Sequence, residues 1–100
     1  MDIKKIKQYA EELELLLEHY SKIDKDARLL YDSLQEIITK AKQQIIKKPL
    51  EYGEIPGSYF FIERDLAKYR DLSKCYSTFK LEVTGGDDEY GELRKIVKSI

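Results

Sequence analysis

The chain has 100 residues, of which 37% are charged and 42% hydrophobic, and its formal net charge is −1. This length suits a single domain spanning 1–100, and a net charge near zero excludes a general attraction to nucleic acid or to a membrane surface. Cys75 is the only cysteine, so an internal disulfide is excluded, and no stretch approaches the roughly 20 apolar residues of a membrane span. We therefore expect one cytoplasmic domain without a membrane segment.

The first half of the chain carries one helical stripe of apolar residues. They recur at alternating steps of three and four, which is the spacing of one helix face. The stripe consists of Ile3, Ile6, Ala10, Leu13, Leu17, Tyr20, Ala27, Tyr31, Leu34, Ile38, Ala41 and Ile45. Residues 2–48 therefore form either one helix of roughly 70 Å or an antiparallel hairpin that turns between Ser21 and Asp26. We favour the hairpin, because Asp24 would otherwise lie in the buried stripe, whereas aspartate is favourable at the start of a second helix.

A stretch rich in proline and glycine follows the stripe and predicts a loop. Pro49 disfavours helix at the residue before it, so the second arm ends at about residue 48. Apolar residues at helical spacing then predict a third helix over about 59–77. They include Ile62, Leu66, Tyr69 and Tyr76.

Residues 78–84 are open to two interpretations. Phe79, Leu81 and Val83 alternate with charged residues, which is the pattern of a strand and would make the protein α+β. Two glycines then break the chain, and the apolar residues beyond them predict a short fourth helix over about 88–99. The favoured fold class is all-α, a small up-and-down helical bundle made of the hairpin and these two helices.

No pattern in the sequence indicates catalysis. His19 is the only histidine, and its spacing from Cys75 suggests no nucleophile–base pair. The carboxylates do not follow the spacing of a calcium loop or of a di-iron centre, and no phosphate-binding glycine motif is present. We expect a protein that is not an enzyme and that has no metal site and no cofactor.

Two groups of residues are candidates for a protein interface. Leu15 and Leu29 fall outside the main stripe and have no obvious partner in the chain, which predicts a two-fold homodimer. Tyr52, Tyr59 and Phe60 cluster around the proline- and glycine-rich loop, and exposed aromatic residues are frequent contributors to interfaces.

Lysines form a third candidate surface if the chain turns. A hairpin would gather seven lysines at the end away from the turn, and such a cluster can bind phosphates or another anion. They are Lys4, Lys5, Lys7, Lys40, Lys42, Lys47 and Lys48. In one long helix, the two groups would lie on the order of 50 Å apart.

These observations favour a small intracellular module that binds another protein. An inhibitor of the immunity or antitoxin type, an adaptor and an assembly subunit all fit, and the residues do not select among them. The alternative is a nucleic-acid-associated regulator that binds phosphates through the lysine cluster, although the near-neutral charge makes nucleic acid the less favoured partner.

Overall fold

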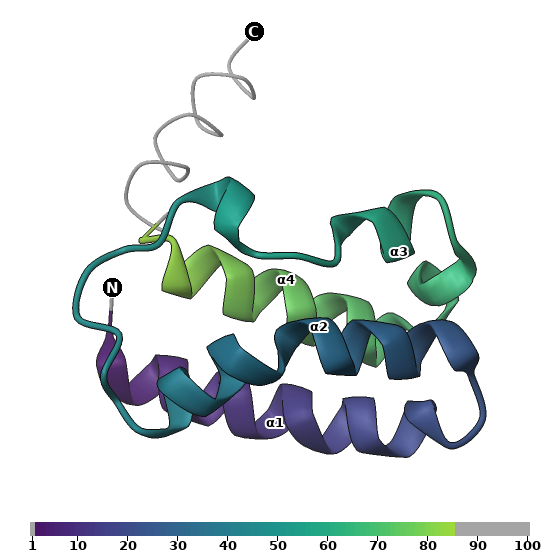
Figure 1. Ribbon diagram of the computed structural model, residues 1–100, viewed down its shortest axis with the longest axis horizontal. Coiled ribbons are helices and arrows are strands. Elements are labelled where there is room, and N and C mark those ends of the chain that lie inside the picture. The colour runs from purple at the N-terminus through teal and green to yellow at the C-terminus, as the bar shows by residue number, and fades with distance from the viewer. Residues whose placement is uncertain (1, 86–100) are drawn as a thin grey trace, which may run out of the picture.

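The computed structural model describes residues 2–85, apart from the side chain of Tyr52, and contains no strand in that range (Figure 1). The elements are α1 (Ile3–Ser21), α2 (Lys25–Lys42), the 3₁₀ turn η1 (Tyr52–Glu54), α3 (Ser58–Ile62), the 3₁₀ turn η2 (Asp65–Lys68) and α4 (Arg70–Val83). The described part measures 41 × 33 × 20 Å. The all-α prediction is confirmed, and a continuous helix over 2–48 is excluded.

The chain turns where the sequence predicted, and α1 and α2 form an antiparallel hairpin. Each helix begins at an aspartate that caps it. A side-chain oxygen of Asp2 accepts hydrogen bonds from the N–H groups of Lys4 and Lys5, and one of Asp24 accepts from the N–H of Asp26 at 2.9 Å. Such caps satisfy N–H groups that have no partner inside the helix. Eight stripe residues of the two helices are buried together with Leu30: Ile6, Ala10, Leu13, Leu17, Ala27, Leu30, Leu34, Ile38 and Ala41.

The second arm is shorter than predicted, because α2 ends at Lys42 rather than near residue 48. Gln44 adopts a left-handed conformation with φ of 58°, and the N–H of Ile45 bonds to the carbonyl of Lys40. This is the Schellman arrangement that terminates helices. It directs Ile46 into the core while Ile45 stays exposed.

The prediction of one continuous helix over 59–77 is wrong, because residues 63–69 separate α3 from α4. The break lets the chain fold back, so that the rings of Phe61 and Tyr76 stack with centroids 4.7 Å apart. In one straight helix these residues would be separated by roughly 22 Å. The folded-back segment covers one flank of α4, where Tyr76 donates a hydrogen bond to the carbonyl of Pro56 and Lys80 donates one to Ser58. The flank of α4 that carries Cys75 is left beside α1.

The alternative strand at 78–84 is also wrong, because α4 continues to Val83. Leu72, Tyr76, Phe79 and Val83 are buried and lie at helical spacing, so α4 has an apolar face of the ordinary kind. Leu81, the middle member of the apparent alternation, is only half-buried. The predicted fourth helix over 88–99 lies outside the described residues.

Candidate functional site

A groove of about 550 Å³ runs between α1 and α4. Its surface is mainly apolar, and each helix contributes the column of residues next to its buried face. The lining residues are Tyr9, Glu12, Leu15 and Leu16 of α1 and Asp71, Lys74, Cys75 and Thr78 of α4. Leu15 is 66% exposed although it is a large apolar side chain. Its side chain therefore adds exposed apolar surface to the groove.

Cys75 is a partly buried thiol on the α4 wall of the groove. Its thiol lies 3.9 Å from the backbone carbonyl of Tyr9, to which it donates a weak hydrogen bond. Burial raises the pKa of the Cys75 thiol to about 11, and the negative charges of Glu12 and Asp71 add to this effect. The thiol is therefore protonated near neutral pH, which does not suit a nucleophile. The groove is instead an apolar surface in a negative local potential.

The rim of the groove carries two carboxylates and one ammonium group. The carboxylate of Asp71 is held in place, because it accepts hydrogen bonds from the hydroxyl of Tyr20 and from the N–H of Leu72, both at 2.8 Å. The bond to Asp71 also raises the pKa of Tyr20. Glu12 is exposed, and Lys74 supplies the only positive charge among the lining side chains. This arrangement suits a ligand that is apolar on one side and carries positive charge beside it.

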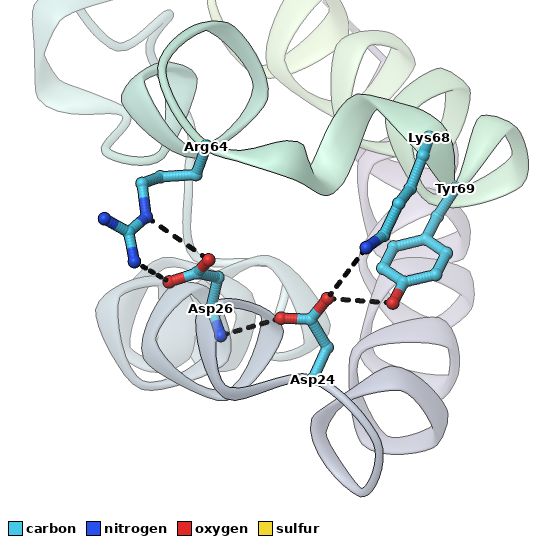
Figure 2. Close-up of polar contacts among 5 residues, drawn as sticks. All are labelled: Asp24, Asp26, Arg64, Lys68 and Tyr69. Atoms are coloured by element: carbon cyan, nitrogen blue, oxygen red, sulfur yellow. Dashed lines mark hydrogen bonds and ion pairs between the residues drawn. The ribbon is translucent and has the colours of Figure 1, made fainter.

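The position of α4 against α1 depends on polar contacts at the hairpin turn, which Figure 2 shows. Two nitrogens of the Arg64 guanidinium donate hydrogen bonds to the two carboxylate oxygens of Asp26, at 3.2 and 3.3 Å. Tyr69 donates a hydrogen bond of 2.8 Å to Asp24, and the ammonium group of Lys68 lies 4.0 Å from the same carboxylate. These contacts anchor the segment before α4 to the start of α2.

The ring of Tyr69 stacks on that of Tyr20, with centroids 4.1 Å apart. Tyr20 in turn bonds to Asp71 in the first turn of α4. The chain of contacts from the hairpin turn therefore reaches the rim of the groove.

Among the predicted interface residues, the rings of Tyr59 and Phe60 lie edge to face, with centroids 5.6 Å apart. Leu15 lines the groove, whereas Leu29 is 45% exposed on α2 and does not line it. Tyr59 is exposed on α3, and Phe60 beside it is half-buried against the core. The structure does not describe the side chain of Tyr52.

The other seven lining residues were not predicted. Tyr9 and Leu16 could have been found in the sequence, as apolar residues beside the stripe of α1. Their pairing with α4 was not visible, because it depends on the fold.

The seven lysines of the predicted cluster are all exposed. Two of them are paired with glutamates, since Lys40 lies 3.2 Å from Glu36 and Lys42 lies 2.7 Å from Glu14. The bond to Glu14 raises the pKa of Lys42. These pairs reduce the positive charge that the cluster could offer to an anion.

Within residues 2–85, no three His, Cys, Asp or Glu side chains are grouped so that they could hold a metal ion. None of the helices in that range is both long enough and apolar enough to cross a bilayer. Comparison with protein-family models, with curated proteins and with solved structures finds no match for this chain.

Proposed function

We propose that this protein is a binding module, not an enzyme, and that the groove between α1 and α4 holds an amphipathic helix of a partner protein. The observation that supports this proposal most directly is the groove itself, with its apolar lining and its two rim carboxylates. The partner helix presents its apolar face to the groove and carries lysine or arginine beside that face. Recognition of a helix in an apolar groove is a recurrent mode of protein binding.

The dimensions of the groove support a helical ligand. On each wall the first and last lining residues are seven positions apart, Tyr9 and Leu16 on α1 and Asp71 and Thr78 on α4. Seven residues correspond to roughly 10.5 Å, or two helical turns, which is the length over which a partner helix presents anchors at i, i+4 and i+7. An inhibitor of the immunity or antitoxin type, an adaptor and an assembly subunit would each use such a surface.

The alternative proposal, phosphate binding through the lysines, has weaker support. Lys40 and Lys42 are already paired with carboxylates, and the net charge of the chain is −1. Non-specific binding to nucleic acid depends on the number of phosphates that lysines and arginines neutralise. The groove, in contrast, combines shape, apolar surface and charge in one place.

Selection from a displayed library of peptides of about 16 residues, long enough for roughly four helical turns, tests the proposal. The baits are the full chain, its Leu15→Glu variant, and Leu29→Glu as a matched control on an exposed leucine outside the groove. We expect enriched peptides with apolar residues at helical spacing and a net positive charge. Their affinity falls at least about tenfold on Leu15→Glu and is unchanged on Leu29→Glu. Peptides that bind all three baits equally, or the absence of any enriched peptide, would overturn the proposal.

A further inference from the structure

We propose that, in the absence of a partner helix, the groove between α1 and α4 binds a second copy of this chain, in a weak dimer whose two-fold axis runs along the groove. The inference rests on the proposed function in treating the groove as a binding surface, and it names an occupant for that surface. A surface that forms a two-fold dimer must be complementary to itself, because both copies contribute the same residues. The groove has this property in its shape and in its charge.

The shape of the groove combines an exposed side chain with a hollow. Leu15 is 66% exposed at the edge of the groove, and the half-buried side chains of Leu16 and Cys75 line it. When two copies face each other across a two-fold axis, Leu15 of each copy lies over the groove of the other. Both leucines then lose contact with water, which favours association.

The two walls of the groove carry opposite charges. Glu12 is exposed on α1, and Lys74 is exposed on α4. Within residues 2–85 neither belongs to an ion pair, although Glu12 accepts a long hydrogen bond of 3.4 Å from Gln8. Each copy therefore offers one charge of each sign to the other.

Glu12 and Lys74 lie at about the same level along the groove, because both are close to Cys75. Lys74 precedes Cys75 in the chain, and the thiol of Cys75 donates a weak hydrogen bond to the carbonyl of Tyr9, three residues before Glu12. Burial and then the negative charge of Glu12 raise the pKa of this thiol. A two-fold axis along the groove keeps the level and exchanges the walls, so Glu12 of each copy meets Lys74 of the other.

The charges favour this axis over the alternative. A two-fold axis across the groove at the same level would place Glu12 against Glu12 and Lys74 against Lys74. Like charges that face each other weaken an interface, whereas opposite charges fix its register. Asp71, at the end of the groove, already accepts hydrogen bonds from the hydroxyl of Tyr20 and from the N–H of Leu72. Its carboxylate therefore does not depend on a cation from the second copy.

The size of the groove indicates that the dimer is weak. The groove spans roughly two helical turns, which is less surface than a standard stable interface buries. We expect a dissociation constant in the micromolar range. The second copy then leaves the groove readily, and a partner helix competes with it for the same surface.

Charge reversal tests the pairing of Glu12 with Lys74. Sedimentation velocity measures the dissociation constant of the full chain at concentrations up to the millimolar range. We expect Glu12→Lys to raise this constant at least about tenfold, and Lys74→Glu to do the same, because each change opposes like charges twice in the dimer. The variant that carries both changes should return to within about threefold of the wild type.

The matched control is Glu63→Lys, which makes the same change of charge at an exposed residue outside the groove and should leave the dimer intact. Three results would each overturn the inference. They are a wild type that stays monomeric, single variants that dimerise as well as the wild type, and a doubly exchanged variant that stays monomeric.

Cys75 reports whether the dimer covers the groove, because it lines the groove and is the only cysteine. The rate at which excess N-ethylmaleimide alkylates the full chain at one fixed pH should fall as the concentration of wild-type protein rises through the dissociation constant. In Glu12→Lys the rate should not change with concentration. Each protein is compared with itself, so an effect of the substitution on the thiol does not matter. A dimer whose Cys75 reacts as fast as that of the monomer would contradict the inference.

The result can be separated from that of the proposed function. The peptide selection is repeated with Lys74→Glu as the bait, because its groove is open in the monomer and keeps both carboxylates. Enriched basic peptides together with a monomeric wild type would support the partner groove and overturn the second copy as its occupant. Dimers that dissociate on charge reversal, together with no enriched peptide, would support the dimer and overturn the proposed function.

Discussion

The hydroxyl of Tyr69 donates a hydrogen bond of 2.8 Å to the carboxylate of Asp24, which joins residues 45 positions apart. The same carboxylate caps α2 through the N–H of Asp26. One side chain therefore both starts a helix and ties the segment before α4 to the hairpin turn. Partial burial raises the pKa of Asp24, but the hydrogen bonds from Tyr69 and from the backbone outweigh burial, and the pKa lies below its ordinary value.

Replacing this carboxylate should destabilise the fold. We expect Asp24→Ala to lower the free energy of unfolding by about 1–3 kcal/mol, because it removes a helix cap and leaves the Tyr69 hydroxyl without its acceptor. Urea denaturation followed by circular dichroism measures the change. The control is Asp32→Ala, which removes an exposed aspartate of the same helix and should change stability by less than about 0.5 kcal/mol.

The pH dependence follows from the direction of the shift. A pKa that is lower in the folded than in the unfolded chain adds stability above the unfolded value, and this stability is lost as the pH falls through the folded value. The difference in stability between wild type and Asp24→Ala should therefore be constant from pH 7 to about pH 5 and should shrink at lower pH. A difference that grew on acidification would contradict the role given to the carboxylate.

Gly57 should be intolerant of any side chain. Its φ is 117°, which L residues rarely adopt, and a Cβ there would overlap Leu30 and lie 3.1 Å from the ring of Tyr76. We expect Gly57→Ala to cost about 2–4 kcal/mol through backbone strain and overpacking. Gly53→Ala is the matched control, since nothing lies within 4 Å of a Cβ at that position. Thermal melts of the two variants check the prediction, and equal melting temperatures would refute it.

Self-association stays a prediction. Because Leu15 and Leu29 are exposed, replacing them tests the dimer without disturbing the core. Leu15 and Leu29 are 66% and 45% exposed, so replacing both with glutamate should leave the stability of the monomer within about 1 kcal/mol of wild type. If they form part of a dimer seam, sedimentation velocity should show dimers of the wild type and monomers of the double variant. Wild-type protein that remains monomeric at high concentration would rule the dimer out.

The lysine cluster should bind nucleic acid only weakly. We expect a dissociation constant of about 10⁻⁴ M or weaker for a generic DNA duplex at physiological salt, measured by fluorescence anisotropy. Low-micromolar binding would revive the alternative function if it weakened steeply between low and physiological salt and disappeared in Lys4→Glu with Lys5→Glu. Lys22→Glu with Lys25→Glu, at the opposite end of the hairpin, is the matched control for net charge.

The sequence by itself determined the hairpin. The stripe on residues 2–42 has the period of a helix, and a carboxylate at position 24 is costly inside a buried stripe but favourable as a cap. Both signals act between residues a few positions apart, so they can be read without knowledge of the rest of the chain. The same holds for the all-α class, because helices depend largely on local spacing.

The tertiary structure decided the break at residues 63–69 and the groove. Nothing in the local pattern separates Ile62 from Tyr76, and the chain folds back because Phe61 then stacks on Tyr76 while Arg64 and Tyr69 reach the carboxylates at the start of α2. These contacts join residues that are from 15 to 45 positions apart. The strand pattern at 78–84 was misleading for a related reason. Which of these residues are buried depends on the packing of α4 against α1 and α3, not on their alternation in the sequence. The groove exists only because residues beside the buried face of α1 lie next to residues beside the buried face of α4. A single sequence shows which residues flank each buried face, but not which two helices will pack side by side.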